Sequence, residues 1–200
     1  MSAFKKLSYG LFVLTTKLGE IDNGCITNTT MQLTTSPNQI CIAVNKANYT
    51  HDLIVQSKTF NVSIIDQTAS FELFKHFGFQ SGRNVNKFND FSDFARSSNG
   101  VTYITKGVNA YVSACVTSTI DLGTHTLFIA TVTEDNVLSE NKSATYQYYF
   151  DNIKPKPQKA VETLWRCSIC GYEEKVENLP DDFVCPWCKH PKSDFIKVEK

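Results

Sequence analysis

The sequence lacks the features of several large classes of protein. Its 200 residues carry no formal net charge and no long block of like charge, so nucleic acid is not an expected partner. No apolar run approaches the length that spans a membrane, and the first ten residues lack the apolar core of a signal peptide. The nine glycines never take the Gly-x-Gly-x-x-Gly spacing of a Rossmann dinucleotide site. We therefore expect a cytoplasmic protein without a Rossmann domain.

Four cysteines near the C-terminus form the most specific pattern in the chain. Cys167 and Cys170 make one Cys-x-x-Cys pair, and Cys185 and Cys188 make a second pair after fourteen intervening residues. Each pair places two sulfurs on one side of a tight turn, and two such turns facing each other build a tetrahedral site. The spacing predicts a site for iron or zinc, with disulfides as the alternative.

The residues around these cysteines favour iron. Gly171, directly after the first pair, permits a backbone geometry that directs N–H groups at the sulfurs, and such hydrogen bonds tune a redox metal. Aromatic side chains are expected to form an apolar cap, which also suits a redox site. They are Trp165, Tyr172, Phe183, Trp187 and Phe195. A zinc ribbon with the same four ligands is the alternative.

This C-terminal stretch resembles rubredoxin. Cys-x-x-Cys-Gly-Tyr at 167–172 and Asp-Asp-Phe-Val-Cys-Pro-x-Cys at 181–188 match the two motifs of that family. The ending Cys-x-His-Pro-Lys-x-x-Phe at 188–195 is similar to the short rubredoxin module that ends rubrerythrins. Lys189 stands where a glycine is usual after the fourth cysteine. The resemblance implies one iron held by the four thiolates.

The rest of the chain reads as mainly β. Short runs rich in β-branched and aromatic residues alternate with Gly, Asn and Pro, and many short strands with few helices predict a closed or nearly closed antiparallel barrel. The predicted strands are 11–16, 24–30, 40–45, 60–65, 101–105, 110–119 and 126–133. The remaining cysteines lie in apolar stretches and are each expected to be small core residues; they are Cys25, Cys41 and Cys115.

Helices are predicted at only a few places. A short one is expected at 3–7, and longer ones at 50–57 and 70–77, each of which begins with a hydroxyl residue suited to an N-cap. The polar stretch 81–99 is predicted as a loop. It carries a phenylalanine at every third position, which covers either a hydrophobic surface or a dimer contact; these residues are Phe88, Phe91 and Phe94.

The stretch 23–53 is dense in hydroxyl and amide side chains. Such groups suit a neutral, polyhydroxylated ligand that bears one phosphate, such as FMN, although strand ends rich in Thr and Asn also arise from plain turn chemistry. Lys46 and Thr50 precede a helix that starts near His51, where free N–H groups and the helix dipole favour a phosphate. The polar residues are Thr27, Asn28, Thr29, Thr30, Gln32, Thr34, Thr35, Asn45, Asn48 and Thr50.

Residues 8–150 resemble the flavin reductase family, whose fold is an FMN-binding split barrel. The matching pieces are Ser8-Tyr9-Gly10, Asn23-Gly24-Cys25, Thr27-Asn28-Thr29, Ser36-Pro37, Asn45-Lys46-Ala47-Asn48-Tyr49-Thr50, Phe60-Asn61-Val62-Ser63, Phe77-Gly78, Ser81-Gly82-Arg83, Gly123-Thr124-His125-Thr126 and Tyr146-x-Tyr148-Tyr149. The resemblance implies flavin ring and ribityl contacts from 27–34 and phosphate contacts from 45–50. It also implies a homodimer and an NAD(P)H site that needs no Rossmann domain.

Two further residues are candidates within that resemblance. Arg83 is placed to pair with a phosphate of FMN or of the nicotinamide nucleotide, and a solvated loop arginine is the alternative. The resemblance puts His125 beside the flavin face where the nicotinamide docks. We take it as the candidate catalytic residue, with a core histidine on a strand as the alternative.

The two resemblances together predict three parts and one activity. The parts are an FMN-binding domain at 1–153, a linker at 154–163 and a rubredoxin-like domain at 164–200. A hydride brings two electrons whereas a thiolate-bound iron takes one, and FMN accepts the pair and releases electrons singly. We therefore expect an oxidoreductase that passes electrons from NAD(P)H through FMN and iron to a protein acceptor.

The fusion of the two modules resembles the high-molecular-weight rubredoxins of anaerobic microbes. That resemblance implies a flavodiiron protein, which reduces oxygen or nitric oxide, as the acceptor. Two alternatives stay open. One is an NAD(P)H-dependent reductase of free flavin with a structural or regulatory metal module, and the other is a non-enzymatic binding protein with a zinc ribbon.

Overall fold

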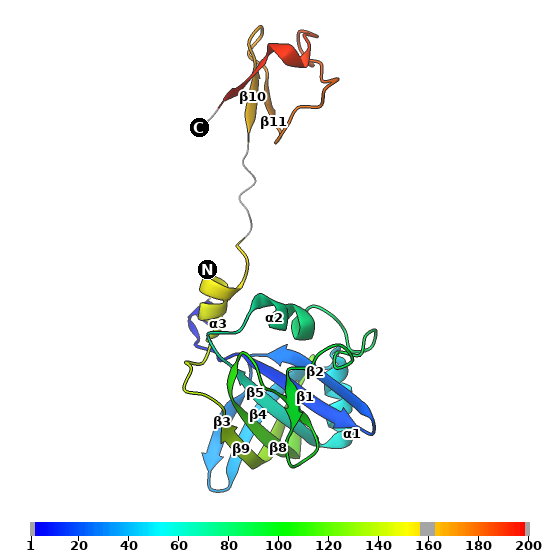
Figure 1. The fold of residues 1–200 in the computed structure, drawn as a ribbon, viewed down its shortest axis with the longest axis vertical. Coiled ribbons are helices and arrows are strands. Elements are labelled where there is room, and N and C mark those ends of the chain that lie inside the picture. Colours follow the sequence, from blue (N-terminus) through cyan, green and yellow to red (C-terminus); the bar gives the residue numbers. More distant parts are fainter. Residues whose placement is uncertain (1–2, 157–162, 199–200) are drawn as a thin grey trace. The chain divides into compact units, whose positions relative to one another are not determined.

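The computed structural model describes residues 3–156 and 163–198 (Figure 1). The chain divides into two compact units, Met1–Pro155 and Lys156–Lys200. Most of the predicted linker, residues 157–162, lies outside the described residues. Within the described part, no helix is both long and apolar enough to cross a membrane. Each unit is described by itself below.

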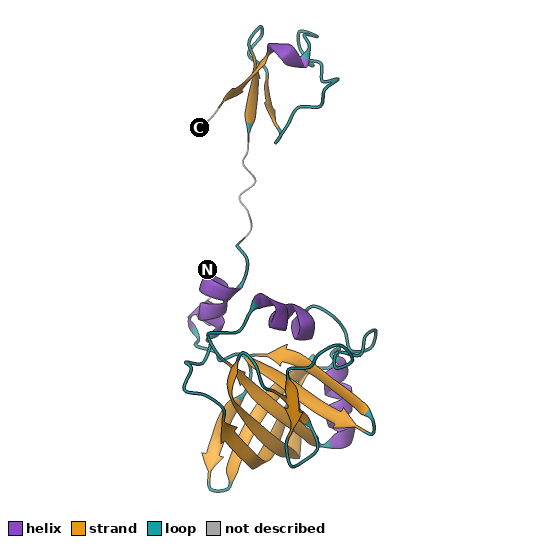
Figure 2. Ribbon diagram, in the orientation of Figure 1, coloured by secondary structure: helices purple, strands orange, loops and turns teal. Residues whose placement is uncertain are grey.

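The first unit is built on one antiparallel sheet of seven strands, in the order β2-β1-β5-β8-β9-β4-β3. The strands are β1 (Phe12–Leu18), β2 (Ile21–Thr27), β3 (Met31–Thr35), β4 (Asn38–Asn45), β5 (Thr59–Ile65), β8 (Val108–Asp121) and β9 (His125–Val137). The two edge strands, β2 and β3, are joined by residues 28–30 alone, so the sheet must curl until its edges approach. The predicted antiparallel barrel is therefore confirmed (Figure 2).

All seven predicted strands are present, but the sequence missed β3 and also β6 (Phe94–Arg96), which lies in the predicted loop 81–99. The five residues of β3 are all exposed, so the strand has no alternation between apolar and polar residues to detect. The predicted strand at 101–105 is β7 (Thr102–Ile104), which pairs with the short β6 (Phe94–Arg96) outside the barrel sheet.

Helix α1 (Tyr49–Ser57) links the edge strand β2 to the inner strand β9. Its Thr50 accepts a hydrogen bond from Asn23 of β2 at 2.9 Å, and its His51 bonds Thr126 of β9 at 2.9 Å. Thr50 was the predicted N-cap, and this was wrong. The cap is Asn48, whose side chain accepts from the Thr50 amide at 3.0 Å, which leaves the buried Thr50 hydroxyl free to bond across to β2.

The remaining helices gather at one end of the barrel. Helix α2 (Phe71–Gly78) covers that end, and Ser70 is its N-cap residue but makes no capping bond through its side chain. The others are η1 (Ala3–Lys6), α3 (Tyr146–Tyr148) and the π-helical turn η2 (Tyr149–Ile153). Two cores result because β1 is buried on both faces: Phe12 and Leu14 point into the barrel, whereas Leu11 and Val13 pack beneath α2.

Two sequence predictions are decided by this packing. The phenylalanines of the loop after α2 cover a hydrophobic surface, because Phe88 and Phe91 pack on Phe77 of α2 with ring centroids 5.6 and 5.1 Å apart. The prediction that all three isolated cysteines lie in the core is wrong for one of them. Cys25 and Cys41 are buried, but Cys115 is exposed because it follows the buried Ala114 on β8 and faces outward.

The second unit is a small three-stranded sheet with a cysteine-centred core. Its strands are β10 (Leu164–Cys167), β11 (Glu173–Lys175) and β12 (Phe195–Val198), in the order β11-β10-β12, with one 3-10 turn, η3 (Lys192–Asp194), before β12. The fully buried residues of its core cluster are Cys167, Leu179, Cys185 and Phe195. Two of these four are predicted metal ligands, so little apolar packing holds the unit together without them.

Candidate functional site

The four predicted ligands converge in the second unit. All four cysteine sulfurs lie within 4.8 Å of one another, with Cys167 and Cys188 at 3.6 Å and Cys170 and Cys185 at 3.5 Å. A tetrahedral metal with bonds of about 2.3 Å to sulfur requires sulfurs roughly 3.8 Å apart. The four cysteines are free thiols rather than disulfides. The donor set therefore fits one iron or zinc ion, and the chemistry of four thiolates suits either metal.

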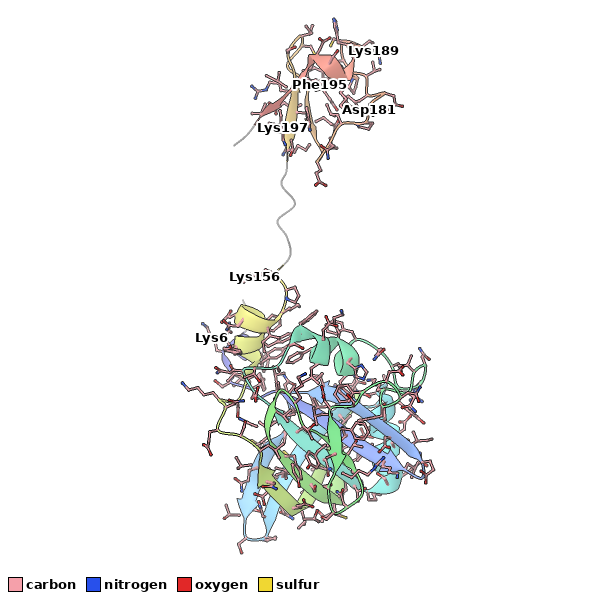
Figure 3. The ribbon with its side chains drawn as sticks, viewed as in Figure 1. Lys6, Lys156, Asp181, Lys189, Phe195 and Lys197 are labelled. Atoms are coloured by element: carbon pink, nitrogen blue, oxygen red, sulfur yellow. The ribbon has the colours of Figure 1, made fainter. Side chains whose placement is uncertain are left out.

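Two equivalent turns hold these sulfurs. In the first, Gly171 has φ +77° and its amide bonds the Cys167 carbonyl at 3.0 Å. In the second, Lys189 has φ +63° and its amide bonds the Cys185 carbonyl at 3.0 Å. Lys189 lies on this second turn in Figure 3. The second turn thus keeps the same hydrogen bond although a lysine replaces the usual glycine, at the cost of a left-handed backbone on a residue with a Cβ.

Backbone amides also point at the sulfurs. The amide of Tyr172 hydrogen-bonds the Cys170 sulfur, and the amide of His190 hydrogen-bonds the Cys188 sulfur two residues before it. Such bonds stabilise thiolate charge and tune a bound metal. Both bonds come from the second residue after a cysteine. The Cys185 sulfur takes two more, from the amides of Trp187 and Cys188.

The aromatic cap is present but incomplete. Phe183 and Phe195 pack with ring centroids 5.3 Å apart, and Trp165 and Tyr172 pack against the same core. Trp187 contacts the Tyr172 ring at 5.3 Å yet is 70% exposed, so it lies on the rim rather than over the metal site. Its neighbour Cys185 is fully buried, which keeps water from at least one ligand.

A polar cavity of about 410 Å³ lies in the first unit, beside the N-terminus of α1. Two of the predicted flavin residues, Asn45 and Asn48, line it. The other walls come from β2, α1, the end of α2 and the loop after it. They are Cys25, Ile26, Ala47, Tyr49, Phe77, Gly78, Phe79, Gln80, Ser81, Gly82 and Lys87.

Close packing fixes the loop that closes this cavity. A Cβ added at Gly82 would lie 2.1 Å from the side-chain oxygen of Asn23, so only glycine fits there. Asn23 is itself buried and donates to Thr50 in the first turn of α1. The loop at 81–82 therefore packs close to the N-terminus of α1. The shape of the cavity there depends on Gly82 having no side chain.

The predicted residues of 27–34 lie around the connection from β2 to β4. Thr29 donates to the Ala43 carbonyl at 2.8 Å and shares a hydrogen bond of 2.9 Å with Thr27. The Thr30 hydroxyl is one of five buried side-chain atoms without a hydrogen-bond partner among the described residues, so it is available to a ligand. Asn28, which stands between Thr27 and Thr29, is half-buried.

Two residues of the same predicted group serve the β3–β4 hairpin instead. Gln32 donates to Asn38 at 3.1 Å, and Thr34 donates to the Pro37 carbonyl at 2.5 Å. Both side chains are exposed. Their polar groups are thus engaged within the hairpin.

The two cations predicted for phosphate contacts are already paired. Lys46 contacts Asp121 at 2.7 Å, and Arg83 contacts Asp52 at 2.5 Å while its guanidinium lies 5.1 Å from the Tyr49 ring centroid. Hydrogen bonds from His51 and Arg83 lower the pKa of the Asp52 carboxyl. An arginine bound in this way carries little unbalanced charge.

His125 begins β9 and pairs in register with Asn45, which lines the cavity. Its Nδ1 lies 2.9 Å from the Thr124 hydroxyl, and the residue is half-buried. The other histidine near this end of the sheet, His51, is engaged on both ring nitrogens by Asp52 and Thr126. Of the two, His125 is the one with a ring nitrogen left for a ligand among the described contacts.

Lys87 is a residue of this cavity that the sequence reasoning missed. It stands in a segment predicted as a polar loop, yet it is 3% exposed and donates to the carbonyls of Gly24 at 2.8 Å and Phe77 at 2.9 Å. Nothing in the local pattern distinguishes it from a solvated lysine. Its environment depends on the end of α2, ten residues earlier at Phe77, and on β2, which lies 63 residues away at Gly24.

Comparison with known proteins follows the same division of the chain. The model of the flavin reductase like domain matches residues 4–156, and the model of the rubrerythrin, rubredoxin-like domain matches residues 165–196. High molecular weight rubredoxin from Moorella thermoacetica is 31% identical over 98% of this chain and 98% of its own length. Ferric-chelate reductase (NAD(P)H) from Archaeoglobus fulgidus is 35% identical over 74% of this chain and 88% of its own length.

A solved structure shows the same fold. An NADH:FAD oxidoreductase from Streptomyces globisporus superposes with a TM-score of 0.62 and 21% identity, covering 70% of this chain and 81% of that one. The predicted pairing of a flavin reductase-like unit with a rubredoxin-like unit is confirmed, as is the prediction of an oxidoreductase with flavin and thiolate-bound iron as cofactors. The chain belongs to the flavin reductase-like family and carries a rubredoxin-like domain at its C-terminal end.

Proposed function

We propose that the protein passes electrons from NAD(P)H through FMN to a single iron bound by its four C-terminal cysteines, and from there to a separate acceptor protein. The observation that carries this proposal is the convergence of four sulfurs within 4.8 Å in a chain that belongs to the flavin reductase-like family. The NAD(P)H in the name of the Archaeoglobus ferric-chelate reductase supports the choice of donor.

The electron count explains why one chain carries both sites. A hydride delivers two electrons, and each ferric centre takes one, so one NAD(P)H and two Fe(III) give NAD(P)⁺, two Fe(II) and one proton. When bound, FMN supplies the step between a two-electron donor and a one-electron acceptor. The thiolate site binds no substrate in this scheme. Its four cysteines hold the metal in one geometry during transfer, and their amide bonds stabilise the charge on sulfur.

The residues that would hold FMN come from two stretches. For the phosphate we propose the cradle before α1, formed by Asn45, Lys46, Asn48 and Thr50, with Arg83 facing it from the loop after α2. For the ring and ribityl chain we propose the polar connection between β2 and β4, that is Thr27, Asn28, Thr29, Thr30, Gln32 and Thr34. The unpartnered hydroxyl of Thr30 supports this choice. His125 would orient the nicotinamide by a hydrogen bond from its imidazole.

We propose a flavodiiron protein as the acceptor. The proposal is supported by the likeness to high molecular weight rubredoxin over nearly the whole of both chains. Exposed apolar side chains around the metal site, Ile169, Val184 and Trp187, suit a transient protein contact.

A cysteine variant tests the electron path. Cys185→Ser removes one ligand, so flavin reduction by NADH should keep its wild-type rate while reduction of the acceptor falls to the rate without the protein. Cys115→Ser, at an exposed cysteine outside the metal site, is the matched control. Stopped-flow absorbance separates the two steps. Full-rate acceptor reduction by Cys185→Ser would show that iron is not the conduit and would favour the free-flavin reductase.

We further propose that the protein is a homodimer in the cytoplasm. Strand β3 is an edge strand with all five residues exposed, and its Met31 and Leu33 are 59% and 41% exposed. Exposed apolar edge strands invite pairing with another chain, which supports a second copy as the partner. Light scattering should give twice the 22.5 kDa chain mass, and Leu33→Lys should shift it to the monomer. A monomeric wild type would overturn this part.

A further inference from the structure

Lys87 is a buried cation with one donor to spare. Its ammonium group has three N–H donors, and two of them bond the carbonyls of Gly24 and Phe77 at 2.8 and 2.9 Å. The residue is 3% exposed, and the carbonyl of its own backbone is bonded by His76 at 2.6 Å. Main chain and side chain are therefore both held in place. Burying an ammonium group is costly unless a negative charge lies close by.

No such negative charge is present among the described residues. Lys87 makes no ion pair there, whereas Lys46 and Arg83 are each paired with an aspartate. The ionisable group that interacts with its charge is the Cys25 thiol, and burial raises the pKa of that thiol, which keeps it neutral near pH 7. Burial also lowers the pKa of Lys87, which is the signature of a charge that lacks compensation.

Lys87 lies at a cavity where its charge can contact a ligand. It lines the 410 Å³ cavity and is the one charged side chain among the described residues that does so. The start of α1, at Asn48 and Tyr49, also lines it, and the helix dipole adds positive potential there. A cavity lined by both a buried ammonium group and a helix N-terminus is suited to a compact anion.

We propose that Lys87 binds the phosphate group of the flavin and makes this site select FMN over riboflavin. The inference rests on the proposed flavin function of the same cavity and assigns the charge recognition to a residue outside the 45–50 stretch. Lys87 then supplies the uncompensated charge at the phosphate, because the charges of Lys46 and Arg83 are balanced by their aspartate partners. Phosphate at the cavity would take the third N–H of Lys87 and supply the missing negative charge.

A purely structural role is the rival explanation. The Phe77 carbonyl lies at the C-terminal end of α2, so Lys87 also satisfies a terminal carbonyl of that helix. Loss of that bond would lower stability without regard to the ligand. The two roles are separated by a ligand that lacks the phosphate, because a helix-capping lysine has no reason to distinguish FMN from riboflavin.

The first measurement uses the wild-type, metal-loaded full chain after removal of flavin. Isothermal titration calorimetry should give tighter binding of FMN than of riboflavin by about 10- to 150-fold, the range of a charge-assisted hydrogen bond. Inorganic phosphate should compete with FMN and leave riboflavin affinity unchanged. A wild type that binds neither flavin would overturn the proposed function itself. A wild type that binds both equally would overturn the role of Lys87 alone.

The second measurement uses Lys87→Met, which keeps the length of the apolar stem. FMN affinity should fall by about 10- to 150-fold and riboflavin affinity by less than about 3-fold. Lys75→Met, at an exposed lysine of α2 that pairs with Glu72 outside the cavity, is the matched control and should keep the full preference for FMN. Equal losses for the two flavins in Lys87→Met would assign the lysine to structure and overturn the proposal. If this variant does not fold, Lys87→Gln replaces it with the same two outcomes, because its neutral amide keeps two donors for the carbonyls of Gly24 and Phe77.

Discussion

The two candidate sites are built from the chain in opposite ways. The metal site takes its four ligands from Cys167 to Cys188, in two turns that repeat one another. The flavin cavity takes its walls from Cys25 to Lys87, through two strands, two helices and a loop. A site made by local turns is visible as a spacing in the sequence. A site made by distant segments is defined by packing, and its key residues carry no local signature.

The comparison also extends to stability. The first unit has two apolar cores of more than ten residues each, whereas the fully buried core of the second has four residues, two of them ligands. Folding of the second unit should therefore depend on its ligand, and folding of the first should not.

Removal of the metal should give the largest difference between the units. With a chelator, the second unit should unfold, because metal binding to such small sites supplies on the order of 10 kcal/mol. Hydrogen exchange followed by mass spectrometry should show amide protection lost from 164–198 and kept throughout the barrel strands. Protection that survives chelation in the second unit would mean that its apolar core suffices, which would remove this contrast.

Gly82→Ala tests how closely the cavity depends on packing. The new Cβ would displace Asn23 from its bond to Thr50, so we expect a loss of about 1–3 kcal/mol in the free energy of unfolding and weaker FMN binding. Gly78→Ala is the control, because its Cβ would meet the Ile26 side chain at 3.2 Å. Chemical denaturation and FMN titration measure the two effects. Equal behaviour of both variants would argue against a rigid cradle.

The two cysteine turns offer a matched pair within the metal site. Gly171→Ala places a Cβ on a left-handed residue and should destabilise the metal-bound unit by about 1–2 kcal/mol. Lys189→Gly removes such a Cβ from the equivalent position and should stabilise it by up to about 1 kcal/mol. The rate of metal loss to a chelator should rise in the first variant and fall in the second. A change of the same sign in both would show that the turns are not equivalent.

The smallest expected effect comes from the surface ion pair beside the cavity. Asp52 has a folded pKa below its usual range because His51 and Arg83 donate to it. Such a carboxylate adds stability above its unfolded pKa of about 3.9, and that stability is lost as the pH falls through the lower folded pKa. Asp52 is 37% exposed, so screening limits the effect to less than about 1 kcal/mol.

Thermal denaturation between pH 7 and pH 2 measures this contribution. Asp52→Asn should destabilise the first unit at pH 7 and converge with the wild type in acid. The melting of the second unit should not change. A constant difference at every pH would assign the effect to lost hydrogen bonds instead of charge.

Much of the fold follows from patterns that are short in sequence. Six of the seven barrel strands alternate apolar and polar residues or are buried on both faces, so these six are predictable. The exposed β3 is not, because a strand without a buried face has no pattern. The N-cap of α1 was predicted two residues too late. Threonine is also an accepted N-cap residue, and the bond of Thr50 to Asn23 on another strand cannot be read from the sequence.

The sequence by itself determined the metal site and the class of each unit, because Cys-x-x-Cys turns and strand periodicity act over a few residues. Tertiary structure alone decided which polar and charged groups are free. It paired Arg83 with Asp52 and Lys46 with Asp121, turned Cys115 outward and buried Lys87 without a counter-charge. Whether a charge is compensated depends on the charged groups close to it in space, so it cannot be inferred from residues close to it in the sequence.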